Sequence, residues 1–143
     1  MNAEKLFSIC NSIALIGWIL LVFAPRWRWT SRLVLAGAIP LLLAAVYLTL
    51  IVTTFGKADG GFGTLGDVMK LFSYPWVALA GWVHYLVFDL FVGSWEVRDA
   101  QSCGVSHWLV LPCLVLTFLL GPIGFLLYHV VRRFAKKDLL TNE

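Results

Sequence analysis

Residues 75–99, PWVALAGWVHYLVFDLFVGSWEVRD, form an apolar run that is long enough to cross a bilayer and yet contains ionisable side chains. His84 and Asp89 lie inside the run. Three charged residues follow at its far end, namely Glu96, Arg98 and Asp99. An ionisable group in hydrocarbon costs about 2.5–3.5 kcal/mol on insertion scales. Because this cost must be offset, the run predicts a membrane helix whose polar groups have a use.

The composition of the chain supports the same class of protein. Of its 143 residues, 60% are hydrophobic and only 13% are charged, whereas a soluble domain has roughly 25% charged residues. A helical span needs about 20 apolar residues, and four runs are this long: 6–24, 33–55, 75–93 and 108–131. The sequence therefore predicts an all-α membrane protein, a bundle of four transmembrane helices that forms a single domain over residues 1–143.

Other features narrow the class further. The first run is longer than the core of a signal peptide and ends in PRWRW (25–29) rather than at a small-residue cleavage site, so we interpret it as a retained span. The three cysteines lie on different segments without a CxxC spacing, which predicts neither a disulfide nor a metal or redox pair. The net charge of +3 is placed at the ends of the spans, which suits lipid head groups and indicates no nucleic-acid partner.

Four spans would place both termini and the 56–74 loop on one side of the membrane, with seven Lys and Arg residues. The 25–32 and 94–107 loops on the other side would hold four, three of them clustered in the first loop. The positive-inside rule then favours cytoplasmic termini, and the arginine cluster argues the other way. Without a transit extension, we expect an integral protein of a bacterial inner membrane, both termini in the cytoplasm.

Proline and glycine residues interrupt two of the predicted spans. Pro40 is expected to kink the second span, because proline removes a helical hydrogen bond. Gly121-Pro122-Ile123-Gly124 is expected to distort the fourth span, and backbone groups freed at that depth must find partners or line a cavity. The Gly-rich segment 56–73 predicts a flexible connector that ends in a short amphipathic helix at the membrane surface.

An acidic stripe and an aromatic stripe run side by side along the third span at 100° per residue. One stripe contains Trp82, Tyr85, Asp89, Glu96 and Asp99, and the other contains His84, Phe88, Phe91 and Trp95. Asp89 could fix helix packing by accepting hydrogen bonds from Asn11, Tyr47 or Arg98. His84 and Asp89 could instead be acid–base groups. A metal site is less well supported, because the paired Glu-x-x-His pattern is missing, and an ion pathway is a further alternative.

Four strings resemble the ABA-deficient-four-like family of small four-span membrane proteins: FAPRWRW (23–29), PLLLAAVYL (40–48), FSYPWVALAGWVHYLVFDLFVGSWEVRDA (72–100) and HWLVLPCLVLTFLLGPIGFLLYHVVRR (107–133). The resemblance covers nearly the whole chain. Plant members are required for making neoxanthin from the epoxide violaxanthin. The resemblance therefore implies an isomerisation in which an epoxide opens while a proton leaves the polyene end.

An epoxide opening of this kind needs an acid at the oxygen and a base at the departing proton. We expect a cofactor-independent isomerase without a metal, in which Asp89 is the base and His84 or Tyr85 the acid. Arg98 would steady the charge that develops on oxygen. The expected substrate contacts are Trp82, Phe88 and Phe91 along the polyene, with Asn11, Glu96 and Asp99 as polar contacts. The partner would be a membrane lipid or carotenoid-like substrate, and a homodimer is plausible because four helices barely enclose an elongated ligand.

Two other functions fit the same sequence. A non-catalytic subunit could bind a carotenoid or lipid and present it to a partner enzyme. A small transporter is weakened by the lack of an internal repeat in the chain.

Overall fold

The structure, a computed structural model, describes residues 2–54 and 56–141, with side chains as far as residue 135. Every secondary-structure element in this part of the chain is a helix. Their bounds are α1 Ala3–Phe23, α2 Arg28–Thr30, the π-helical turn η1 Ser31–Leu35, α3 Ala38–Thr54, α4 Leu65–Phe72, α5 Pro75–Ser102, α6 His107–Leu120 and α7 Pro122–Thr141. The all-α prediction is confirmed.

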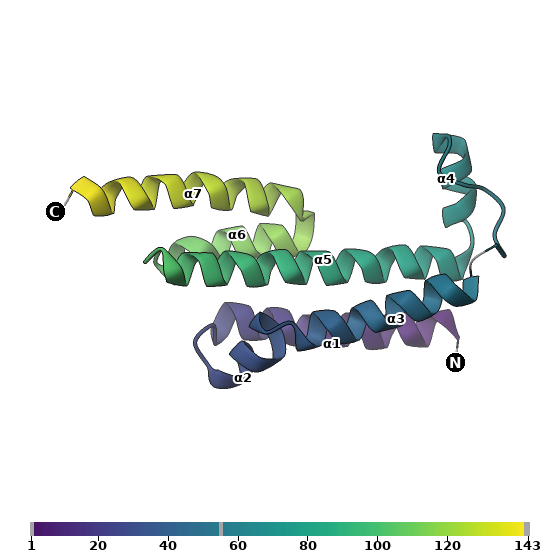
Figure 1. Cartoon of the computed structure of the whole chain (residues 1–143), viewed down its shortest axis with the longest axis horizontal. Coiled ribbons are helices and arrows are strands. Elements are labelled where there is room, and N and C mark those ends of the chain that lie inside the picture. The colour runs from purple at the N-terminus through teal and green to yellow at the C-terminus, as the bar shows by residue number, and fades with distance from the viewer. Residues whose placement is uncertain (1, 55, 142–143) are drawn as a thin grey trace.

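Helix α5 is the central element of the bundle. It contacts α1 and α3 along one side and α6 and α7 along the other, so that the remaining helices are arranged around it (Figure 1). Small residues allow α1 to approach closely: a Cβ atom on Gly93 would lie 2.7 Å from the Trp18 ring, and one on Gly17 would lie 2.8 Å from Leu90. The core is therefore fixed by glycines on both partners of the α1–α5 pair.

Three segments are long and apolar enough to cross a membrane, judged by length and composition: Ala3–Phe23, Arg28–Thr54 and Pro75–Ser102. The second of them is interrupted near its start, where Gly37 has a φ of 88° between η1 and α3. Pro40 lies in the first turn of α3, where no helical hydrogen bond is lost. The interruption thus falls three residues before the kink that the sequence predicted.

The predicted fourth span is not one helix. Helix α6 ends at Leu120. Helix α7 begins at Pro122 and packs back against α6 as an antiparallel hairpin (Figure 1). Gly121 makes this reversal with a φ of 47°. A Cβ atom on Gly124 would overlap the Thr117 backbone nitrogen and the Cys113 carbonyl oxygen. The GPxG segment is therefore the tip of a turn, rather than a distortion within a continuous helix.

The first helix of the hairpin is too short to cross a bilayer. The 14 residues of α6 span about 21 Å, less than the hydrocarbon core of about 30 Å. We call the α6–α7 pair the half-length hairpin. As a result, the N-terminus of α1 and the C-terminal end of α7 lie at opposite ends of the bundle (Figure 1). These two helix ends therefore do not share one end of the bundle as expected, and the side of the membrane that each terminus faces stays a prediction.

The predicted amphipathic helix after the Gly-rich connector is present as α4, which runs across the direction of α5 (Figure 1). Thr64 caps its N-terminus, because its side chain accepts a hydrogen bond from the Asp67 backbone N–H. At its other end, Phe72 lies where a Cβ atom on Gly81 of α5 would be. This close approach holds α4 against the start of α5.

Candidate functional site

Asp89 lies at the middle of α5, beside the tip of the half-length hairpin. A Cβ atom built on Gly121 would be 3.0 Å from the Asp89 Oδ1 atom, so glycine is needed at the tip both for its φ and for this approach. The side chain is half-buried, and its Oδ2 atom is buried without a hydrogen-bond partner among the described residues. Buried polar groups nearly always have such a partner. Asp89 therefore has an acceptor that a bound molecule can use.

Tyr85 lies one helical turn before Asp89 on the same face of α5, and the two side chains interact. The Tyr85 hydroxyl donates a hydrogen bond to the Phe118 carbonyl oxygen at 3.0 Å. This carbonyl is among the last four of α6, which lack partners within their own helix. Tyr85 thus holds the hairpin tip over α5 and brings a hydroxyl group next to Asp89.

An apolar groove lies between α1 and α5 and ends at Trp82, about one turn before Tyr85. A pocket of about 340 Å³ is lined by residues of both helices: Ala3, Glu4, Phe7, Pro75, Ala78, Leu79 and Trp82. The Trp82 indole N–H donates to the Asn11 Oδ1 atom at 3.1 Å, and its ring lies 5.3 Å from the Tyr85 ring. Trp82 therefore connects the groove to the Tyr85–Asp89 pair, and Asn11 holds it there.

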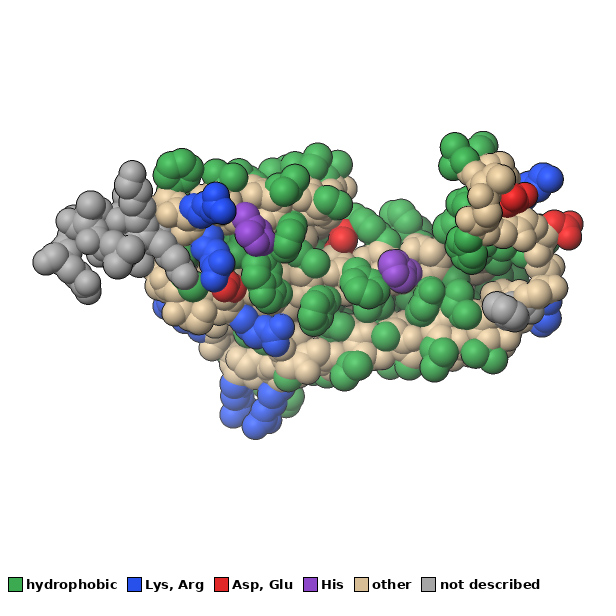
Figure 2. Space-filling model, turned by 45° about the horizontal axis from the view of Figure 1, so that its top comes forward, with side chains coloured by type: hydrophobic (Ala, Val, Ile, Leu, Met, Phe, Trp, Pro, Cys, Tyr) green, Lys and Arg blue, Asp and Glu red, His purple; other side chains and the backbone are tan. Residues whose placement is uncertain are grey.

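Figure 2 shows the face above α5. Beyond the end of the hairpin the surface steps down to a shelf that is mostly hydrophobic and is bounded at its other end by the segment around α4. Trp82 keeps 41% of its surface exposed on α5. An elongated apolar molecule could enter such a site from the side of the bundle.

His84 lies on a different side of α5 from Asp89. Its ring is 4.7 Å from the Phe88 ring and 5.6 Å from the Tyr47 ring of α3. Phe88 and Phe91 line a second groove of about 350 Å³, between α5 and residues 36–44, which include the start of α3. Five residues correspond to about 140° around a helix, so the structure does not bring His84 and Asp89 together.

Glu96 is completely buried beneath the hairpin. Its Oε1 atom accepts a hydrogen bond from the Thr117 hydroxyl at 2.9 Å, and its Oε2 atom has no partner among the described residues. Thr117 belongs to α6, so this contact lies inside the α5–α6 interface. Glu96 is therefore shielded from any molecule in the α1–α5 groove.

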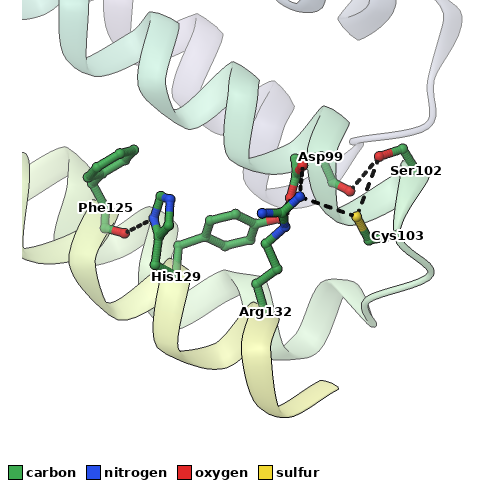
Figure 3. A network of polar contacts seen from close by, with 7 residues as sticks. Asp99, Ser102, Cys103, Phe125, His129 and Arg132 are labelled. Carbon is green, nitrogen blue, oxygen red and sulfur yellow. Dashed lines mark hydrogen bonds and ion pairs between the residues drawn. The ribbon is translucent and has the colours of Figure 1, made fainter. Parts of the chain in front are cut away.

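Asp99 belongs to a network that joins α5 to α7 (Figure 3). Its Oδ2 atom is 2.6 Å from the Arg132 Nε atom, and its Oδ1 atom accepts from Arg132 Nη2 at 2.9 Å. The Tyr128 hydroxyl also donates to Asp99 Oδ2, at 2.6 Å. Beside the network, the His129 ring stacks on the Trp95 ring of α5. These contacts fix the half-length hairpin on α5.

Arg98 points in another direction. Its Nη1 atom donates to the Leu35 carbonyl oxygen of η1 at 3.0 Å, which places the guanidinium group at the break in the second span. The described contacts of Arg98 do not include Asp89. Arg98 thus stabilises the start of α3 in this structure.

Sequence reasoning missed the hairpin residues that complete the site, namely Thr117, Phe118, Gly121, Tyr128 and Arg132. The GPxG segment was the available signal, because a glycine with positive φ followed by proline ends one helix and begins another. No group of three or more His, Cys, Asp or Glu side chains capable of holding a metal ion is found among the described residues.

Comparison with known proteins gives one match. No curated protein and no solved structure matches the chain significantly. The family model described as ABA DEFICIENT 4-like matches residues 5–128, which include most of α1, all of α2 to α6 and the first part of α7. Together with the three long apolar helices, this match indicates a membrane protein, and the chain belongs to the ABA DEFICIENT 4-like family.

Proposed function

We propose that this protein is an integral membrane isomerase that acts on an elongated isoprenoid of the carotenoid class. The observation that carries the proposal is the Asp89 carboxylate at the hairpin tip, with a buried oxygen that has no partner among the described residues. A tyrosine hydroxyl lies one turn away, and an apolar groove ends at Trp82 beside that tyrosine. The groove would hold the apolar chain of the substrate. The paired polar groups would then meet its reactive end.

Asp89 is the base in this proposal and Tyr85 the acid. Asp89 takes a proton from the carbon beside the epoxide, and the electron pair of that C–H bond becomes a new carbon–carbon π bond. The C–O bond breaks, and the oxygen takes a proton from Tyr85, whose O–H turns away from the Phe118 carbonyl. Proton transfer from Asp89 to Tyr85 then restores both groups, so that substrate and product have the same atoms.

Tyr85 is preferred to His84 as the acid because it shares a helix face with Asp89, whereas His84 faces the Tyr47 and Phe88 rings. The half-buried position of Asp89 also suits this chemistry, because electrostatic interactions are stronger where water is excluded. No role in charge stabilisation is assigned to Arg98, since its guanidinium group donates a hydrogen bond to the Leu35 carbonyl oxygen.

A carotenoid epoxide supplied to membranes that contain the protein tests the proposal. The expected product has an unchanged mass and a shifted absorption spectrum. Asp89→Asn is expected to reduce the rate by about 100-fold or more. Asp59→Asn is the matched control, since Asp59 is exposed and accepts a hydrogen bond from Tyr74 that an amide oxygen can also accept. Full activity in Asp89→Asn would refute the assignment of the base.

A second candidate is a non-catalytic subunit that binds a carotenoid or lipid. It is favoured by the exposed aromatic surface of α5, where Phe88 and Phe91 keep 55% and 50% of their surfaces exposed. Purification with a bound pigment that stays chemically unchanged would support the subunit. Conversion of the pigment by the purified protein alone would support the enzyme.

The family and the charge distribution suggest a bacterial inner membrane. With the half-length hairpin, the end of the bundle that carries the α1–α2 connection holds Arg26, Arg28, Arg32, Arg98, Arg132 and Arg133, and the N-terminal end holds Lys5, Lys57 and Lys70. The positive-inside rule then favours a cytoplasmic location for the arginine-rich end. Labelling of single cysteines at positions 4 and 133 would test this orientation.

A further inference from the structure

A cavity lies apart from Asp89, at the N-terminal end of the bundle. It has a volume of about 500 Å³, within the range of ligand-binding pockets. Apolar side chains of α1, α3 and α5 form part of its lining, among them Leu6, Leu50 and Val77. Its polar lining consists of Thr49, Thr53, Thr54, Lys57 and Tyr74. The cavity is therefore amphipathic and lies at the end of the bundle where α1 and α5 begin and α3 ends.

The three threonines can act as hydrogen-bond acceptors for a ligand. Each hydroxyl already donates its proton to a carbonyl of α3: Thr49 to Ala45, Thr53 to Thr49, and Thr54 to Leu50. Their oxygen lone pairs remain available. This wall of the cavity suits a ligand with free hydroxyl groups.

Lys57 provides a positive charge directly beyond the end of α3. Its side chain is exposed and lines the cavity. The nearby acid Asp59 is not among the lining residues, and its Oδ2 atom accepts the Tyr74 hydroxyl proton at 3.1 Å. An ammonium group beside hydroxyl acceptors matches an anion that carries hydroxyl groups on the same molecule.

We propose that this cavity binds the head group of an anionic phospholipid with free hydroxyls, such as a glycerol phosphate ester. The phosphate would contact Lys57, and the glycerol hydroxyls would donate to the threonine oxygens. The acyl chains would follow the apolar lining toward the bilayer. Trp76 also lines the cavity and keeps 39% of its surface exposed. Tryptophan side chains favour the boundary between lipid and water. The site is separate from Asp89 and does not depend on the proposed isomerase function.

Lipid-dependent thermal stability of the purified full-length protein tests the proposal. Phosphatidylglycerol is expected to raise the melting temperature more than phosphatidylcholine does. Lys57→Gln is expected to weaken phosphatidylglycerol binding by about tenfold, the effect of losing one charge-assisted hydrogen bond. Thr53→Val should also weaken it, while leaving the binding of phosphatidic acid, which has no glycerol hydroxyls, unchanged. Lys70→Gln, on exposed α4, is the matched control and should bind as the parent does.

Three results would overturn the proposal. The first is an equal effect of phosphatidylglycerol and phosphatidylcholine on the parent protein. The second is equal lipid binding by Lys57→Gln and Lys70→Gln. The third is binding of an uncharged isoprenoid alcohol that depends on Thr53 but not on Lys57, which would assign the cavity to a different ligand. Native mass spectrometry with each lipid gives the same comparison if a variant loses thermal stability.

Discussion

The two halves of α5 differ in what covers them. The C-terminal half lies beneath the half-length hairpin. There Glu96 accepts a hydrogen bond from Thr117, and Asp99 accepts one from Arg132. The N-terminal half lies beyond the hairpin tip and carries the exposed Trp82 and the α1–α5 groove. Asp89 lies at the boundary between them. Similar carboxylates on one helix face thus have different surroundings, because the covering hairpin ends halfway along the helix.

This comparison gives each half its own expected behaviour. Carboxylates in the covered half join helices, so their replacement should change stability. The carboxylate at the boundary has an oxygen without a partner, so its replacement should change activity. The following substitutions test that division, from the largest expected effect to the smallest.

The strongest test compares the two carboxylates that each have one unpartnered oxygen. Asp89→Asn should lower the isomerisation rate by about 100-fold or more, whereas Glu96→Gln should keep the rate within about threefold, because its amide oxygen can still accept the Thr117 proton. Initial rates in membranes with equal amounts of each variant provide the measurement. Equal loss of activity in both variants would mean that the covered half also takes part in catalysis.

The second test opens the hairpin itself. Gly124→Ala would place a methyl group against the backbone of α6, and overpacking of this kind costs about 3 kcal/mol. Gly66→Ala is the control, because a Cβ atom there has only an ordinary contact with Thr64 at 3.8 Å. Unfolding in detergent with increasing denaturant measures the difference. Similar stability of both variants would show that α6 and α7 are not packed as described.

The third test removes the network that holds α7 on α5. Arg132→Ala leaves the half-buried Asp99 carboxylate without its cation, so the melting temperature should fall. Arg132→Lys should recover only part of this loss, since lysine cannot make the two-point contact. Melting temperatures are measured for the parent, Arg132→Lys and Arg132→Ala, and they are expected to fall in that order. An unchanged melting temperature in Arg132→Ala would show that the network does not contribute to the stability of the protein.

The smallest effect on stability is expected in the N-terminal half of α5, which the hairpin does not cover. Trp82→Phe removes the hydrogen bond to Asn11 and keeps an aromatic ring in the groove. The free energy of unfolding should fall by about 1 kcal/mol, which is the typical contribution of one hydrogen bond. Denaturant unfolding measures this change, and Trp108→Phe serves as the control because that ring is 82% exposed. A loss as large as that of Arg132→Ala would contradict the division of α5 into a structural and an open half.

Much of this architecture was predictable from the sequence. Apolar runs of sufficient length form helices in a membrane because every backbone polar group must be satisfied within the segment, and three of the predicted runs correspond to long helices. The stripe of Tyr85 and Asp89 followed from the helical period alone. The family was also identified correctly from four strings of residues.

The path of the chain after Leu120 was decided only by tertiary structure. The GPxG segment was compatible with a kinked span and with a turn, since both need a local break in hydrogen bonding. The turn is selected by contacts between distant residues: Gly124 fits against Thr117, Tyr85 binds the Phe118 carbonyl, and Arg132 pairs with Asp99. Apolar composition fixes which segments enter a membrane, because it is a local property. The depth that the hairpin reaches, and hence the exposure of Asp89, depends on packing against α5 that no local pattern encodes.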